Sequence, residues 1–256
     1  MHDVRFPIYE KIKDVEGWLN EPAADFTQRL LRHLGSIGAN GAVGEFGVHK
    51  GKYLALIYAA SELWCDRAVG VDGFFDGQGN VLPEGHRNGA MSSIRQNVGL
   101  ASADLSKLVL VASDTRRLTV DSVRELMVCP IEFISIDGGH DVSTVEHDLN
   151  VALPNLSACG VAALDDAFNP ICPGVAEGIF RFLTKCEGLF APFAICGSKL
   201  FVTRIGSHQA WVGFAKEQLH DSSMGYLERS RILAEQQKTW GELPHFFAQE
   251  VVTFTT

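Results

Sequence analysis

Apolar residues in the middle of the chain occur in short runs of strand length, and these runs alternate with segments of helical spacing. The predicted strands are 42–46, 68–72, 105–112, 131–136 and 159–164. The predicted helices are 53–63, 90–98, 120–127, 142–153 and 174–186. Strands and helices that alternate in this way predict a parallel sheet with helices on its faces.

The two ends of the chain depart from this alternation. Residues 25–34 have helical spacing and stop at Gly35, so residues 1–40 are predicted to form a helical cap. Residues 190–196 and 199–204 flank a Gly-Ser pair, which predicts an antiparallel hairpin with a two-residue turn. The segment 207–242 is polar and predicted to be helical. Its apolar residues are spaced for one packed face: Trp211, Phe214, Leu219, Tyr226, Leu227, Ile232 and Leu233.

Together these elements predict an α/β fold of the doubly wound, Rossmann-like kind. We expect a mostly parallel, seven-stranded sheet with a C-terminal antiparallel hairpin and helical additions. Residues 41–204 are predicted to form the central domain, and residues 205–256 a helical extension packed on it. The sequence leaves open whether this extension pairs two subunits or folds back on its own sheet.

Charge and cysteine content narrow the classes of partner. The chain has 22 basic and 31 acidic side chains and a net charge of −9, which disfavours nucleic acid and anionic membrane surfaces. No run approaches the length of a transmembrane helix, and the N-terminus lacks the pattern of a signal peptide. The six cysteines include no C-x-x-C pair and lie mostly in apolar runs, so we expect buried free thiols in the reducing cytoplasm.

Acidic residues follow two of the predicted strands. Asp137 comes after strand 131–136, and the pair Asp165 and Asp166 comes after strand 159–164. The carboxyl ends of strands form the ligand crevice of an open α/β sheet, so these side chains are expected to meet there. Three carboxylates repel one another unless a cation holds them, and an all-oxygen set suits Mg²⁺. The alternative is that each aspartate caps a helix or forms a turn.

A glycine-bracketed turn joins the first predicted strand to its helix. Gly47 and Gly51 would let the backbone approach a ligand closely. Asp72 ends the second strand, where an acid can bind both hydroxyls of a ribose. An ordinary tight turn is an equally good interpretation of the glycines alone. A nicotinamide-binding site also combines a glycine turn with an acid that binds the ribose. Such a site usually shows G-x-G-x-x-G, whereas here the spacing from Gly44 to Gly47 and Gly51 differs.

The ordered set of motifs resembles that of class I S-adenosylmethionine-dependent methyltransferases. Residues 45–51 resemble the first motif of that family in its E-x-G-x-x-x-G form, and Asp72 stands at the ribose-binding acid. Residues 137–140, which read D-G-G-H, together with Asp165 and Asp166 resemble the metal-dependent, macrocin-type sugar O-methyltransferases. The resemblance covers roughly residues 40–204. It implies an S-adenosylmethionine-binding fold and O-methylation.

The resemblance also implies roles for individual residues. The cofactor-binding residues would be Glu45, Gly47, Gly51, Asp72, Ser113, Asp114 and Asp137. The ligands of Mg²⁺ would be Asp137, Asp165 and Asp166. Glu45 would bind the amino group of the methionine moiety, and Asp114 would contact adenine or simply cap the helix that follows. Asp137 and His140 would be catalytic. Catechol-type relatives carry a lysine base at the position of His140, but a neutral imidazole can also accept a proton.

The function expected from the sequence is methyl transfer from S-adenosylmethionine to a hydroxyl of a small molecule, with Mg²⁺ bound to two neighbouring acceptor oxygens. The D-G-G-H form of the motif favours a sugar or a sugar-bearing natural product. Residues 73–88 and the first forty residues would close over this acceptor. Alternatives are a metal-independent methyltransferase with another acceptor, an oxidoreductase of the nicotinamide type and a non-catalytic nucleotide-binding protein.

Overall fold

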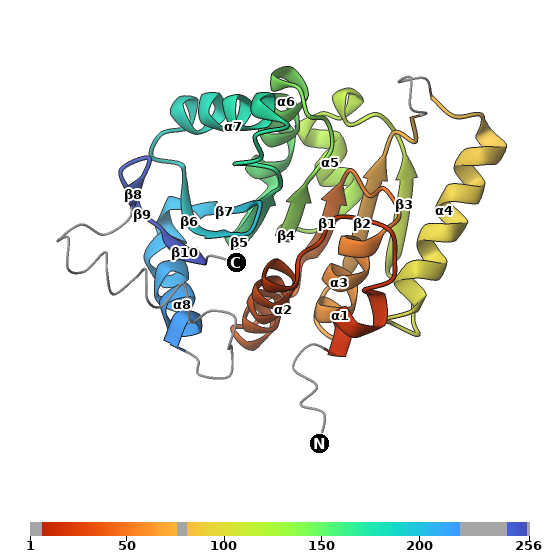
Figure 1. The fold of residues 1–256 in the computed structure, drawn as a ribbon, viewed down its shortest axis with the longest axis horizontal. Coiled ribbons are helices and arrows are strands. Elements are labelled where there is room, and N and C mark those ends of the chain that lie inside the picture. Colours follow the sequence, from red (N-terminus) through yellow and green to blue (C-terminus); the bar gives the residue numbers. More distant parts are fainter. Residues whose placement is uncertain (1–6, 76–80, 221–244, 255–256) are drawn as a thin grey trace.

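The computed structural model describes residues 7–75, 81–220 and 245–254. Its central sheet has eight strands in the order β10-β6-β7-β5-β4-β1-β2-β3 (Figure 1). The strands are β1 (Ala42–Phe46), β2 (Arg67–Asp72), β3 (Leu108–Ala112), β4 (Ile131–Ile136), β5 (Leu156–Leu164), β6 (Phe190–Cys196), β7 (Lys199–Arg204) and β10 (Val252–Phe254). Strands β1 to β5 are parallel, and β7 runs antiparallel to both β5 and β6. The strand order reverses between β1 and β4, which is where sheets of this kind bind ligands.

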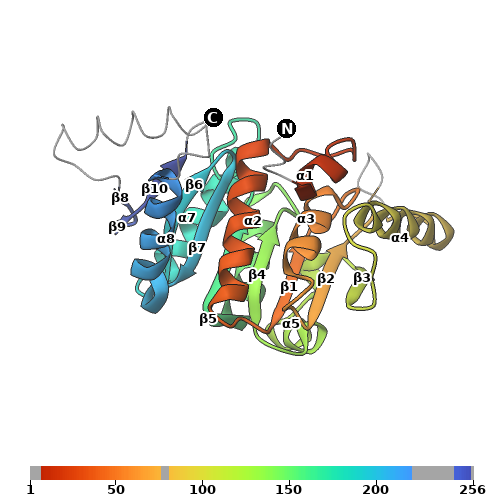
Figure 2. The same cartoon turned by 90° about the horizontal axis from the view of Figure 1, so that it is seen from below.

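Helices cover both faces of the sheet. One face carries α1 (Pro7–Ile12), α2 (Glu21–Ser36), α3 (Lys52–Ser61), α4 (Glu84–Gly99) and α8 (His208–His220). The other carries α5 (Val120–Met127), α6 (Val142–Ala152) and α7 (Pro173–Lys185). Figure 2 shows α2 and α3 side by side over the middle of the sheet. Each face therefore has its own apolar core, and β1 is buried along its whole length. None of the described helices is long and apolar enough to cross a membrane.

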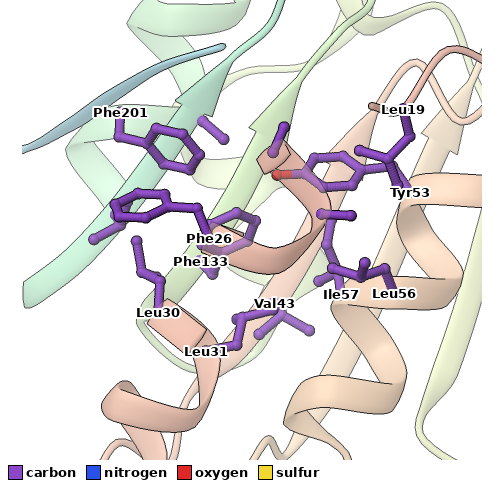
Figure 3. Packing of buried hydrophobic residues seen from close by; sticks show 14 of the residues in the cluster. Leu19, Phe26, Leu30, Leu31, Val43, Tyr53, Leu56, Ile57, Phe133 and Phe201 are labelled. Carbon is purple, nitrogen blue, oxygen red and sulfur yellow. The ribbon is translucent and has the colours of Figure 1, made fainter. Parts of the chain in front are cut away.

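The N-terminal helices pack into the first of these cores. The α2 helix begins at Asn20, whose side chain accepts a hydrogen bond from the N–H of Ala23 at 2.8 Å. Phe26 in α2 is fully buried, and its ring centroid lies 4.9 Å from that of Phe201 in β7 (Figure 3). Full burial of one such side chain contributes about 1.5–3 kcal/mol to stability. Residues 1–40 were predicted to form a cap, and their helix α2 contributes directly to the core.

The parallel strands and the antiparallel hairpin predicted from the sequence are both present. The predicted count of seven strands is wrong, because β10 pairs parallel with β6 as an eighth strand. Residues 205–256 were predicted to be a helical extension, and in their described part the chain forms α8 and also the strands β8 (His245–Phe246), β9 (Gln249–Glu250) and β10. Four residues of the predicted apolar stripe lie outside the described residues: Tyr226, Leu227, Ile232 and Leu233.

Some boundaries also differ from the prediction. The segment 73–88 was expected to be a loop, but α4 begins at Glu84, directly after Pro83. Pro83 lacks an N–H and suits a helix start. This helix is hard to see in the sequence because it buries only Ile94 and Val98. Residues 76–80 of the predicted loop lie outside the described residues.

Candidate active site

The acidic residues that end the strands meet at one edge of the sheet. Glu45 lies in β1, Asp72 ends β2, Asp137 follows β4, and Asp165 and Asp166 follow β5. These strands are parallel neighbours in the order β5-β4-β1-β2, so their carboxyl ends face the same way. The backbone N–H groups of Asp137 and Asp165 still donate to the neighbouring strands, at 2.8 and 3.0 Å. Both residues are therefore held rigidly where the sheet stops.

The glycines of the first turn are required by their surroundings. Gly47 has φ +83°, and a Cβ at this position would lie 1.9 Å from the carbonyl oxygen of Asp137. The turn after β1 therefore touches the loop after β4, which only glycine permits. Gly51 has φ +81°, and a Cβ there would lie 2.9 Å from the Ile94 side chain. The predicted glycine turn thus has a structural reason for both glycines.

Asp72 holds this turn in place. One carboxylate oxygen accepts hydrogen bonds from the N–H groups of Val48 and His49, both at 2.9 Å. The other oxygen accepts from the N–H of Phe74 at 2.7 Å. Asp72 therefore fixes the shape of the crevice between β1 and β2. The oxygen that accepts from Phe74 keeps lone-pair capacity for a further donor such as a hydroxyl.

A pocket of about 410 Å³ opens beside Asp72. It runs from the glycine turn to the start of α6, and three predicted cofactor residues line it: Gly47, Asp72 and Asp114. The other four predicted residues do not belong to its lining: Glu45, Gly51, Ser113 and Asp137. The lining also includes residues outside the predicted cofactor set: Phe75, Thr115, Arg116, Gly138 and Thr144. Arg116 and Thr144 were not indicated by the sequence, because the turns after β2, β3 and β4 that form the pocket wall become neighbours only in the fold.

Asp114 caps the short 3₁₀ helix Thr115–Arg117. Its carboxylate accepts a hydrogen bond from the N–H of Arg116 at 3.0 Å and pairs with the guanidinium of Arg116 at 2.7 Å. The bond from Arg116 lowers the pKa of Asp114. The cap that the sequence left as an alternative is thus present, and Asp114 also lines the pocket. A contact with adenine stays a prediction.

The edge of the sheet next to this pocket buries a group of carboxylates. Glu45 is 2% exposed, and within the described residues one of its carboxylate oxygens has no hydrogen-bond partner. Burial raises the pKa of Glu45 well above its usual range, and Asp137 raises it further. Burial likewise raises the pKa of Asp137, with Asp165 as the next contributor. A cationic ligand at this place would lower both pKa values and favour the ionised carboxylates.

Lys199 in β7, the strand next to β5, places one cation beside these carboxylates. It is the first residue of β7 and is 2% exposed. Its ammonium lies 2.6 Å from a carboxylate oxygen of Asp165 and 4.1 Å from the ring centroid of Tyr53. Burial tends to raise the pKa of Asp165, but the ammonium of Lys199 overcomes this and lowers it. Lys199 was not among the predicted site residues. A lysine among apolar residues at the start of a predicted strand does indicate a buried charge, which needs a partner.

Asp165, one of the three aspartates predicted to bind Mg²⁺, is already engaged by other groups in this arrangement, and Mg²⁺ ligation stays a prediction. Both carboxylate oxygens of Asp165 are engaged, one by Ser198 at 2.5 Å and the other by Lys199 at 2.6 Å. Mg²⁺ needs free oxygen donors at about 2.0–2.1 Å in a nearly octahedral arrangement. The ammonium of Lys199 already compensates the charge of Asp165, so this carboxylate does not need a metal to stay ionised in the buried site.

Asp166 has a different environment from Asp165. Its backbone has φ +53°, a left-handed conformation that is uncommon for a residue other than glycine. One carboxylate oxygen accepts a hydrogen bond from Asn169 at 3.0 Å, and the other lies 3.6 Å from Nε2 of His140. The His140 side chain is 56% exposed. The structure thus brings His140 to the site, at a place that an acceptor can reach.

No protein-family model matches the sequence, and no curated protein matches it. Solved structures do match. CalS11, a calicheamicin methyltransferase, superposes with a TM-score of 0.54 at 19% identity, covering 72% of this chain and 77% of the other. The O-methyltransferase NovP superposes with a TM-score of 0.51 at 16% identity, covering 71% and 78%.

The chain has the fold of these O-methyltransferases. A third match, the MycE methyltransferase in complex with Mg, S-adenosylhomocysteine and mycinamycin VI, has a TM-score of 0.51 at 14% identity. It covers 78% of this chain and 54% of the MycE chain. The resemblance drawn from the motifs is confirmed at the level of the fold.

Proposed function

We propose that this protein transfers a methyl group from S-adenosylmethionine to a hydroxyl of a small molecule, and that the acceptor is a sugar or a sugar-bearing natural product. The observation that carries the proposal is the pocket of about 410 Å³ at the carboxyl ends of the parallel strands, where Asp72 holds the glycine turn. The O-methyltransferase fold supports the same reaction class.

The residues around this crevice fit the parts of the cofactor. Asp72 would bind a ribose hydroxyl, because it lines the pocket and its oxygen that accepts from Phe74 can accept a further hydrogen bond. Glu45 and Asp137 would hold the positive methionine end, which would remove the cost of their burial. Asp114 and Thr115 stand at the end of the pocket that would receive adenine. When bound, S-adenosylmethionine supplies the activated methyl group.

His140 would act as the general base. Its imidazole is exposed at the mouth of the site, and the carboxylate of Asp166 lies 3.6 Å from Nε2. The negative charge of Asp166 would stabilise the imidazolium that forms when His140 takes the proton of the acceptor hydroxyl. Positioning of the hydroxyl against the methyl group is the larger task for the protein, since the leaving group is already activated.

The D-G-G-H motif and the substrates named for two of the matching structures support the proposal of a sugar acceptor. CalS11 is described as a TDP-rhamnose 3'-O-methyltransferase. MycE was solved with mycinamycin VI and Mg. In this chain the ammonium of Lys199 already pairs with the carboxylate of Asp165. The proposed reaction therefore has no step that requires Mg²⁺. The proposal is therefore the metal-independent form of the expected O-methyl transfer.

The first test is calorimetric titration of the full chain with S-adenosylhomocysteine. We expect wild type to bind and Asp72→Asn to bind at least about tenfold more weakly, because a hydrogen bond to a charged group contributes roughly 1.5–3 kcal/mol. Asp121→Asn is the matched control, since Asp121 is an exposed aspartate of α5. Absence of binding by wild type, with binding of a reduced nicotinamide cofactor instead, would contradict the proposal.

The second test is turnover with a panel of sugars and glycosides, followed by mass spectrometry for the added methyl group. Replacement of His140 by Gln should lower the turnover about 10²- to 10⁴-fold and leave cofactor binding unchanged. Tight cofactor binding without turnover on the entire panel would favour a non-catalytic binding protein.

A further inference from the structure

Cys172 carries a thiol, a group that can act as a nucleophile or bind a metal, and the proposed reaction does not use it. All six cysteines are free, but only Cys65 and Cys196 are fully buried, so the expectation of buried thiols is correct for these two. Cys172 precedes α7 and is partly exposed. The thiol lies beside His140 and Asp166, and the ligand atoms of the three residues all lie within 4.8 Å of one another.

We propose that His140, Asp166 and Cys172 form a binding site for a single borderline divalent ion of the Zn²⁺ class. This site differs from the expected magnesium set, with which it shares only Asp166. Nitrogen, oxygen and sulfur donors together suit Zn²⁺ and disfavour Mg²⁺, which prefers oxygen alone. Three protein ligands would leave a fourth position for water or for an oxygen of another molecule.

The distance between His140 and Asp166 supports this assignment. At 3.6 Å, Nε2 and the carboxylate oxygen are too far apart for a good hydrogen bond. A nitrogen and an oxygen ligand of one tetrahedral Zn²⁺, with bonds of about 2.0–2.2 Å, lie about 3.3–3.6 Å apart. The separation therefore matches two corners of a metal site better than it matches a direct contact.

The backbone brings the three ligands together from two loops. Two successive turns link Asp166 to Asn169 and Asn169 to Cys172, with N–H to carbonyl distances of 3.1 Å in both. Asn169 also donates to one oxygen of Asp166, which orients the other oxygen toward His140. Gly174 allows the close approach of the His140 loop, since a Cβ there would lie 2.9 Å from the carbonyl oxygen of His140.

Metal binding here does not depend on methyl transfer. The thiol of Cys172 would lose its proton to solvent as the ion binds, because the thiolate is the metal ligand. Nε2 of His140 could not accept a proton from an acceptor while it bound the ion. On the proposed function, Zn²⁺ would therefore inhibit the enzyme by occupying its base.

The test uses the chelator-treated full chain and Co²⁺, which reports thiolate ligation through charge-transfer absorption in the near ultraviolet. We expect one Co²⁺ per chain with this absorption. Cys172→Ser should abolish the absorption and weaken Zn²⁺ binding in calorimetry at least about tenfold, since loss even of a residue that only orients a ligand costs roughly 10- to 100-fold. His140→Gln should weaken Zn²⁺ binding to a similar extent. Cys186→Ser, at the other end of α7, is the matched control and should change neither result.

Bound Co²⁺ without thiolate absorption, or equal Zn²⁺ affinity in wild type and Cys172→Ser, would overturn the proposal. Circular dichroism shows whether each variant is folded, and Cys172→Ala provides a second variant. Neither readout requires catalysis, so failure of the metal site is distinguishable from failure of the proposed function. If the transferase is active, Zn²⁺ should inhibit wild type at least about tenfold more strongly than Cys172→Ser.

Discussion

Asp165 and Asp166 are adjacent in sequence but have opposite environments. The Asp165 side chain is 7% exposed and is held by Ser198 and by the ammonium of Lys199. The Asp166 side chain is 22% exposed and faces His140 across 3.6 Å. The left-handed backbone at Asp166 turns it toward solvent directly after the strand has ended. Asp165 is thus one partner of a buried ion pair, whereas Asp166 is open to ligands.

The comparison shows that a doubled acid is not necessarily a metal site. A buried carboxylate must be protonated, paired or bound to metal, and its surroundings decide which. Asp165 is paired with Lys199 in a well-packed place, which makes the pair costly to break from either side. Asp166 has no such requirement, because water can solvate it.

The largest effect is expected for Lys199→Met. The substitution leaves Asp165 buried without its cation, so the free energy of unfolding should fall by about 3–5 kcal/mol. The midpoint of urea unfolding measures this, and the double variant Lys199→Met, Asp165→Leu should recover much of the loss. Lys185→Met, which breaks an exposed pair with Glu146, should cost less than about 1 kcal/mol. Equal losses for the two lysines would contradict the comparison.

Asp148 provides a buried carboxylate without a cation. It is fully buried, and among the described residues neither of its oxygens has a hydrogen-bond partner. Burial raises its pKa from 3.8 to about 6, so the folded state favours the protonated form. The contribution of this group to the free energy of unfolding is complete below pH 3.8. It falls by about 3 kcal/mol as the pH rises through 6. Asp148→Asn should remove this loss.

Urea unfolding of wild type and Asp148→Asn between pH 4 and 7 measures the difference. The variant should gain stability relative to wild type as the pH rises through this range. The control is Asp121→Asn, whose side chain is 81% exposed and which should follow wild type. Parallel pH profiles for wild type and Asp148→Asn would count against a raised pKa.

Asp141 is a carboxylate whose ionised form is stabilised by hydrogen-bond donors instead of by a cation. It caps α6 by accepting from the N–H groups of Ser143 and Thr144, both at 3.0 Å. Bonds from the Ser143 and Thr144 side chains lower its pKa to about 2. Asp141→Ala should therefore lower stability by about 1 kcal/mol at pH 7. The difference should vanish as the pH falls from 3.8 toward 2, which thermal unfolding at several pH values would show.

The smallest effect on stability is expected for Asp166→Asn. The side chain is partly solvated and the bond from Asn169 can persist, so the free energy of unfolding should change by less than about 0.5 kcal/mol. The same variant should lose the proposed Zn²⁺ site. A destabilisation as large as that of Lys199→Met would mean that the two aspartates act as one structural unit.

The sequence was sufficient to predict the parallel strands, the hairpin and the edge at which Asp72, Asp137 and Asp165 meet. The alternation of apolar runs with helical spacing sets these features, and the topology follows from it. Strand β10 was missed because three residues, Val252–Phe254, are too few to show a period. Such a strand is identified only by its pairing with β6.

The partners of the site residues could not be predicted. Lys199 lies in a hairpin, and nothing local shows that its side chain reaches Asp165. The positive φ of Asp166 has no signal in the sequence, which therefore could not separate Asp166 from Asp165. Cys172 becomes a neighbour of His140 only because Gly174 lets two loops touch.

The most direct test is calorimetric titration of Mg²⁺ into the chelator-treated full chain that has been saturated with S-adenosylhomocysteine. With Lys199 as the cation at Asp165, the account predicts cofactor binding that needs no metal and no stoichiometric uptake of Mg²⁺. Uptake of one Mg²⁺ per chain, lost in a folded Asp165→Asn variant, would show that Lys199 yields Asp165 to a metal and would contradict the account.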